Sequence, residues 1–172
     1  MTNAAAGTGI GATTQVYRVY IKATPEKVWD AITKPEWSRR FGYGGDVEYD
    51  LRPGGKYRAI ASPEMRAGGA PEIAVDGGVI EVDPPRRLVQ TWRLVMDPES
   101  AAEGFTRLTF ELEPKADGVT RLTLTHELEH APRHAYLLSG GMDDDGSGGG
   151  GGWAWVLSSL KTLLETGETL PW

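Results

Sequence analysis

The chain has 172 residues, of which 40% are hydrophobic and 24% charged, a composition typical of a folded globular protein that excludes disorder throughout. An excess of Asp and Glu gives a formal net charge of -6, which disfavours nucleic acid as a partner. There is no cysteine, and no apolar stretch approaches the ~18 residues of a membrane span. We therefore expect a cytoplasmic protein with a disordered tail at residues 1–14 and one domain over residues 15–172.

The first part of the chain predicts a strand, two short helices and a hairpin. Residues 16–23 alternate between apolar and polar side chains, which is typical of a half-buried strand. Thr24 is a good helix N-cap and Pro25 a good first helical residue, so a short helix follows. An aromatic-rich connection over residues 35–45 comes next. Residues 47–59 then contain two alternating segments joined by an Arg-Pro-Gly-Gly turn, which indicates a hairpin.

The middle of the chain predicts four further strands separated by short connections. They cover residues 73–82, 88–95, 105–113 and 120–127, and the segments 61–72 and 96–104 are expected to be loops. The pair Gly77-Gly78 indicates a β-bulge or bend within the first of these strands. The last three strands must form an antiparallel meander, because their connections are too short for a parallel crossover.

The C-terminal part predicts a flexible glycine-rich loop at residues 139–152 and then a long helix. Apolar residues from Trp153 to Leu164 recur with helical spacing and form one stripe, and Gly167 ends the helix. This order of elements predicts an α+β fold. An antiparallel sheet of about seven strands has one face covered by the C-terminal helix and the other face exposed to water.

Several segments together resemble the SRPBCC superfamily. They are ATPEKVWDAIT at residues 23–33, Trp37, DLRPGG at 50–55, EVDPPRRLV at 81–89, TWR at 91–93 and TRLTLTH at 120–126. The branch they are most similar to is that of the heat-shock ATPase activator homologues, often labelled polyketide cyclase-like in bacteria. The resemblance implies a helix-grip fold, in which a curved sheet wraps around the C-terminal helix and leaves a cavity. It also implies binding of small apolar or aromatic molecules, with no catalytic residues shared across the family.

Polar residues predicted to point into this interior are the strongest candidates for contact with a ligand. Alternation along the strand from Leu88 places Gln90 and Trp92 inward, and Tyr49 and Tyr57 offer hydroxyl groups. An unpaired Gln90 would cost about a few kcal/mol, so it needs a ligand, an ordered water or a neighbouring side chain. The alternative is that these residues fill the core and bond to one another. The full candidate ligand-binding set is Trp37, Phe41, Tyr49, Tyr57, Gln90, Trp92, Phe110, Leu124, His126, Trp153 and Leu157.

Residues 126–130 read His-Glu-Leu-Glu-His and match the zinc-peptidase pattern, which requires a helix. Here a strand runs directly into His126, and Pro132 follows too closely for a helix, so we expect no metal site and no cofactor. At its strand end His126 points toward the cavity and is the candidate catalytic acid or base. The alternative is a buried or rim histidine bonded to the protein. His130 and His134 are expected in an exposed loop.

The sequence therefore leaves three functions open. The first is binding of a small hydrophobic or aromatic molecule, and the second is a polyketide cyclase or hydrolase-type enzyme that uses His126. The third is a co-chaperone-like domain that binds another protein. We expect a monomer or homodimer without a nucleic-acid or membrane partner. An imidazole packed against protein would contradict the enzyme hypothesis.

Overall fold

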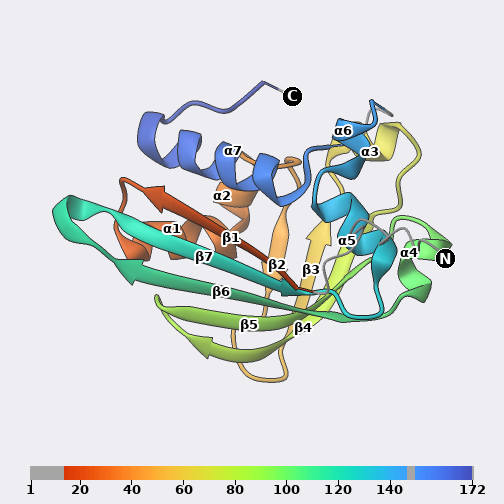
Figure 1. Ribbon diagram of the computed structural model, residues 1–172, viewed down its shortest axis with the longest axis horizontal. Coiled ribbons are helices and arrows are strands. Elements are labelled where there is room, and N and C mark those ends of the chain that lie inside the picture. The colour runs from red at the N-terminus through yellow and green to blue at the C-terminus, as the bar shows by residue number, and fades with distance from the viewer. Residues whose placement is uncertain (1–13, 147–149, 172) are drawn as a thin grey trace, which may run out of the picture.

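A computed structural model describes residues 14–146 and 150–171 and contains one antiparallel sheet in the order β1-β7-β6-β5-β4-β3-β2 (Figure 1). The strands are β1 (Thr14–Ile21), β2 (Val47–Tyr49), β3 (Lys56–Ile60), β4 (Ile73–Asp83), β5 (Arg87–Leu94), β6 (Thr106–Pro114) and β7 (Thr120–Glu127). The predicted tail lies outside the described residues, apart from Thr14, which begins β1. The predicted α+β class and the β5-β6-β7 meander are confirmed.

The helices are short except for the last. They are α1 (Pro25–Thr33), α2 (Pro35–Ser38), α3 (Pro63–Ala67), α4 (Pro98–Ala102), α5 (Pro132–Leu138), α6 (Gly141–Asp144) and α7 (Gly152–Thr166), with a 3₁₀ turn at Ala116–Gly118. Figure 1 shows α7 crossing the sheet on the side that also carries α1 and α2, as a helix-grip fold requires. Among the described helices, none combines the length and apolar character needed to span a bilayer.

Helix α7 carries its predicted apolar stripe into the core. The stripe residues that are buried are Trp153, Leu157, Leu160, Leu163 and Leu164. They face a sheet whose inner residues Leu108, Leu122 and Leu124 are at most 1% exposed. Burying each of these large apolar side chains contributes about 1.5 to 3 kcal/mol, so the contact between α7 and the sheet is a principal source of stability. The helix ends at Gly167, whose positive φ of 78° is the expected left-handed C-cap.

Three of the short helices begin with the same local signal. Thr24, Ser62 and Asp97 are each followed by Pro-Glu, and each side chain accepts a hydrogen bond from the backbone N–H three residues later, at 3.3, 3.2 and 2.9 Å respectively. The prediction for α1 is confirmed. The prediction that 61–72 and 96–104 are loops is wrong in part, because the same cap and proline start α3 and α4 there.

Strand β4 is irregular at a different place from the predicted one. Its register with β5 shifts between Val79 and Glu81 instead of at Gly77-Gly78. The glycine at position 77 has another role, because a Cβ there would lie 1.9 Å from the carbonyl oxygen of Thr91. Glycine is required for the two strands to approach closely, and the β-bulge follows just beyond.

The glycine-rich segment 139–152 is also more structured than predicted. Within it, α6 occupies Gly141–Asp144, and the first turn of α7 begins at Gly152. Residues 147–149 lie outside the described part of the chain. The prediction of an uninterrupted loop is therefore wrong, because local helical hydrogen bonds form on either side of the remaining glycines.

Candidate ligand-binding site

Two tyrosines and a glutamine meet on the inner face of the sheet. Tyr49 on β2 lies directly opposite Tyr57 on β3, and their ring centroids are 4.6 Å apart. Gln90 on β5 is 0% exposed, and the Tyr49 hydroxyl donates to its Oε1 at 2.6 Å. The inward direction predicted for these residues is confirmed, as is the alternative that they bond to one another.

The amide of Gln90 is satisfied on one side only. Its oxygen accepts from Tyr49, but its Nε2 makes no hydrogen bond of normal geometry to a described residue, although the Tyr57 hydroxyl, whose pKa the Gln90 side chain lowers, lies close by. A side-chain amide nitrogen carries two N–H donors, and a buried donor left unpaired costs about 1 to 3 kcal/mol. The interior of the sheet therefore contains an unused donor group.

Burial keeps both tyrosine hydroxyls protonated. It raises the pKa of Tyr49 well above its ordinary value, with a further rise from the neighbouring Tyr57 that the hydrogen bond to Gln90 only partly offsets. Burial likewise raises the pKa of Tyr57, and the nearby Trp92 and Gln90 side chains lower it only in part. The cluster is uncharged at neutral pH.

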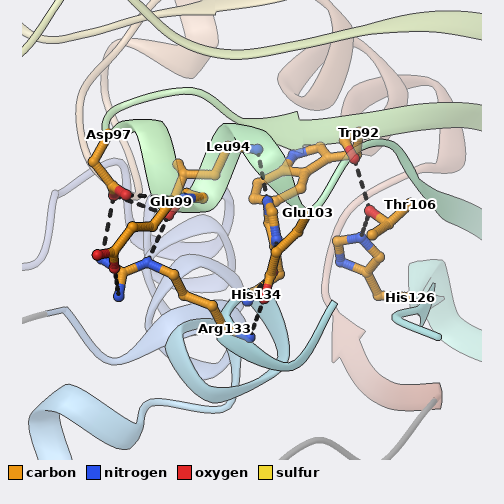
Figure 2. A network of polar contacts seen from close by, with 10 residues as sticks. Trp92, Leu94, Asp97, Glu99, Glu103, Thr106, His126, Arg133 and His134 are labelled. Atoms are coloured by element: carbon orange, nitrogen blue, oxygen red, sulfur yellow. Dashed lines mark hydrogen bonds and ion pairs between the residues drawn. The ribbon is translucent and has the colours of Figure 1, made fainter. Parts of the chain in front are cut away.

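His126 is packed into the protein with both ring nitrogens in hydrogen bonds. Trp153 donates its indole N–H to Nδ1 at 3.1 Å, so Nδ1 carries no proton. The proton of the neutral ring is therefore on Nε2, which donates to Thr106 Oγ1 at 2.7 Å. Thr106 in turn donates to the carbonyl oxygen of Trp92 at 2.7 Å, a contact drawn in Figure 2. These bonds fix one neutral tautomer.

This environment contradicts the prediction that His126 acts as an acid or base. The ring is 0% exposed, and burial, with a smaller contribution from His134, lowers its pKa from 6.5 to about 3. A general base must reach its substrate and accept a proton near the working pH. His126 meets neither condition, because its acceptor nitrogen is already occupied by Trp153. We therefore assign it a structural role.

The prediction that His134 is exposed in a loop is wrong. It lies in α5, is 0% exposed, and its Nε2 accepts the backbone N–H of Leu94 at 3.0 Å. Nδ1 therefore carries the proton and faces the carboxylate of Glu103 (Figure 2). Glu103 also accepts the backbone N–H groups of Arg133 and His134 at 2.7 and 2.9 Å. It caps a helix whose own N-cap, Ala131, has no polar side chain.

Trp92 separates the two histidines from the tyrosine and glutamine cluster. Its ring meets His126 and His134 edge to face, with centroids 5.1 and 5.6 Å apart. Gln90 precedes it by two residues on β5 and therefore shares its face of the sheet. The ring nitrogens of both histidines are paired with protein atoms, whereas the Nε2 of Gln90 is not.

The other predicted ligand-binding residues fall into two groups. Phe110, Leu124, Trp153 and Leu157 are at most 8% exposed and fill the core. A second group packs against the core but keeps part of its surface exposed. It includes three predicted residues, Trp37, Phe41 and Tyr49, together with Val47, Ala59, Met65 and Val156. These come from α2 and the segment after it, β2, β3, α3 and α7, and β2 is the strand that carries Tyr49.

Three hydrogen bonds hold the segment after α2 against α7. The backbone N–H of Gly42 donates to Ser159 Oγ at 3.0 Å, and Trp155 donates its indole N–H to the Gly42 carbonyl at 3.1 Å. The backbone N–H of Gly152 donates to the Tyr43 hydroxyl at 3.1 Å. These bonds hold Gly42 and Tyr43 against the first half of α7. The sequence marked this segment only by its aromatic residues.

The zinc-peptidase pattern does not form a metal site. His126 is buried at the end of β7, whereas the His130 side chain is 89% exposed and its backbone has a positive φ of 65°. Within residues 14–146 and 150–171, no group of three or more His, Asp or Glu residues is arranged to hold a metal ion. The strand and Pro132 prevent the helix that the motif needs.

The curved sheet and the helix across it define a helix-grip protein of the SRPBCC superfamily. The chain belongs to the activator of Hsp90 ATPase homolog 1-like family, whose model matches residues 22–165. No curated protein matches the sequence significantly.

Solved structures support the fold over most of the chain. Protein MLL2253 from Mesorhizobium loti is 27% identical, with a TM-score of 0.61, and the match covers 88% of this chain and 96% of that one. BPP1335 from Bordetella parapertussis is 24% identical over 94% of this chain and 78% of that one, with a TM-score of 0.64. The Aha1 dimer from Colwellia psychrerythraea is 23% identical over 90% and 97%, with a TM-score of 0.59.

Proposed function

We propose that this protein binds a small apolar or aromatic molecule between the sheet and α7. The observation that carries the proposal is the set of partly exposed apolar side chains, Trp37, Phe41, Val47, Tyr49, Ala59, Met65 and Val156, that pack against the core from α2, β2, β3, α3 and α7. Ligand sites in proteins are lined mainly by apolar and aromatic groups with a few polar ones. The tyrosine and glutamine cluster supplies polar groups of this kind. Membership of a superfamily of ligand-binding domains supports the same reading.

The proposal is tested with a pair of neighbouring variants on β3. Ala59 lies on the inner face beside Tyr57, whereas Arg58 lies on the outer face and is exposed. Ala59→Phe adds a large side chain on the inner face beside the cluster, and Arg58→Phe adds the same side chain on the outer face. Thermal-shift titration with 2-ethylnaphthalene measures the dissociation constant of each folded variant.

We expect Ala59→Phe to weaken binding at least tenfold and Arg58→Phe to leave the dissociation constant unchanged. Equal affinity of the two variants would place the probe elsewhere on the surface and contradict the proposal. Absence of any thermal shift in the wild-type protein, together with no bound species in native mass spectrometry, would contradict it as well.

The name of the family suggests a second candidate function, the activation of an Hsp90-type ATPase. The relevant measurement is the ATP turnover of a purified Hsp90 with and without this protein. A rise in turnover that Ala59→Phe leaves intact would show a protein-binding role independent of the inner face.

Because the relative from Colwellia psychrerythraea is a dimer, we also propose that this protein forms a homodimer, which sedimentation velocity tests.

A further inference from the structure

We propose that Gln90 selects ligands that carry an uncharged oxygen acceptor, such as a ketone, and bonds that oxygen through its free amide N–H. This inference rests on the proposed function, because it concerns the same inner face. Its starting point is the buried Nε2, which has no partner among the described residues, although the Oε1 of the same amide is bonded to Tyr49 at 2.6 Å.

The existing hydrogen bond decides which chemistry the ligand must bring. Tyr49 donates its only hydroxyl proton to Gln90 Oε1, which leaves the Gln90 amide with N–H donors to offer. A partner for a donor must be an acceptor, and a wholly apolar ligand would keep the amide unpaired. A ligand oxygen at this point therefore removes a penalty that the empty protein bears.

The charges around Gln90 decide between a neutral oxygen and a carboxylate. Among the described residues, the buried polar side chains are amides, hydroxyls and two histidines, and they include no Lys or Arg. His126 carries no positive charge at neutral pH, since its pKa is lowered to about 3 by burial and by His134. The tyrosine hydroxyls stay protonated. A carboxylate would be buried without a counter-charge, at a large cost in solvation.

The first test compares three ligands of one shape. These are 2-acetylnaphthalene, which has a ketone, 2-ethylnaphthalene, which lacks it, and 2-naphthoate, which is charged. We expect the wild-type protein to bind the ketone about threefold to tenfold more tightly than the hydrocarbon, the range of one neutral hydrogen bond. We expect 2-naphthoate to bind more weakly than the ketone.

Gln90→Leu should remove the preference for the ketone, so that the ketone and the hydrocarbon bind with equal affinity. Gln15→Leu is the matched control, because Gln15 is also a buried glutamine but its amide already donates to the Ala135 carbonyl at 2.8 Å. We expect this control to retain the preference. If Gln90→Leu does not fold, the NMR measurement below decides.

NMR reads the contact without a mutation. Gln15 and Gln90 are the only glutamines in the chain, so selective ¹⁵N labelling of glutamine side chains gives two amide signals. We expect 2-acetylnaphthalene to shift the Gln90 amide protons downfield while those of Gln15 stay in place. The hydrocarbon should not produce this downfield shift.

The outcomes separate the two proposals. If the hydrocarbon and the ketone bind equally and Gln90 stays unshifted, a buried water satisfies the amide and the selectivity is refuted, while the proposed function stands. Tightest binding of 2-naphthoate would also refute it. If none of the three ligands binds, the proposed function fails and this inference fails with it.

Discussion

Acid should destabilise this protein through His126 before it affects the carboxylates. The pKa of His126 falls from 6.5 to about 3 on folding, because burial disfavours the charged ring and the nearby His134 adds to the effect. When folding lowers the pKa of a base, the stability of the folded state is unaffected by that base above its unfolded pKa, which for His126 is 6.5. Stability is lost as the pH falls toward 3, because the unfolded chain binds the extra proton.

The size of the effect follows from the same shift. Since each unit of pKa difference corresponds to about 1.36 kcal/mol, the full loss approaches roughly 5 kcal/mol near pH 3. Between pH 7.5 and pH 4.5 the expected loss is roughly 2.5 kcal/mol. This window lies above the ordinary pKa of Glu103, whose pKa is lowered further because its hydrogen bonds to α5 outweigh the opposing effect of burial.

The assay is urea unfolding followed by tryptophan fluorescence at several pH values, for the wild-type protein and for His126→Gln. The variant has no titrating group at this position. Between pH 7.5 and pH 4.5, its free energy of unfolding should therefore fall by roughly 2.5 kcal/mol less than that of the wild-type protein. His130→Gln is the control, because that side chain is 89% exposed, and it should follow the wild-type slope. Parallel curves for the wild-type protein and His126→Gln would refute the neutral, buried assignment of His126.

Three further predictions concern the folded state, and each is measured as the free energy of unfolding in urea. Leu160→Ala, at a side chain 1% exposed on the buried face of α7, should lower it by about 2 to 5 kcal/mol. Gly77→Ala should lower it by about 3 kcal/mol. Gly78→Ala is the control and should change it by less than about 1 kcal/mol, because the added Cβ meets nothing closer than 3.4 Å. Equal effects of the two variants would contradict the requirement for glycine at position 77. Glu103→Gln should lower the free energy of unfolding by about 2 kcal/mol at pH 7. This difference should shrink as the pH falls below 4.5, because a carboxyl group whose pKa is depressed by folding gives stability that is lost in acid. Glu99→Gln is the control, since its side chain is 80% exposed, and it should show little change at either pH.

Local signals in the sequence were sufficient for most of the fold. Alternation and the stripe of α7 predicted the strands and the long helix, because both patterns record which face of an element meets the core. The helices α3 and α4 carry the same cap, proline and glutamate as α1, so this signal was present at Ser62 and Asp97. It was missed because helices of five residues have no periodicity to accompany it.

The polar contacts across the fold could not be predicted in this way. His134 was expected to be exposed because its own segment contains Pro132 and no apolar stripe. Its burial depends on Glu103, which lies 31 residues earlier in the chain, and on the backbone of Leu94. The buried role of His126 depends similarly on Trp153 and Thr106. Such pairings arise from how distant elements pack, and no local pattern records them.

Satisfied and unsatisfied polar groups lie on different parts of the inner face, which bears on the proposed binding of a ligand. Near α4 and α5, Arg133, Glu103 and both buried histidines are held in protein contacts, as Figure 2 shows, so that end is closed by the fold itself. Trp92 forms the boundary, since its ring packs against both histidines. On its other side lies the unpaired amide of Gln90. A protein gains stability by pairing buried donors, so this unpaired donor is the polar group that the proposed ligand oxygen would satisfy.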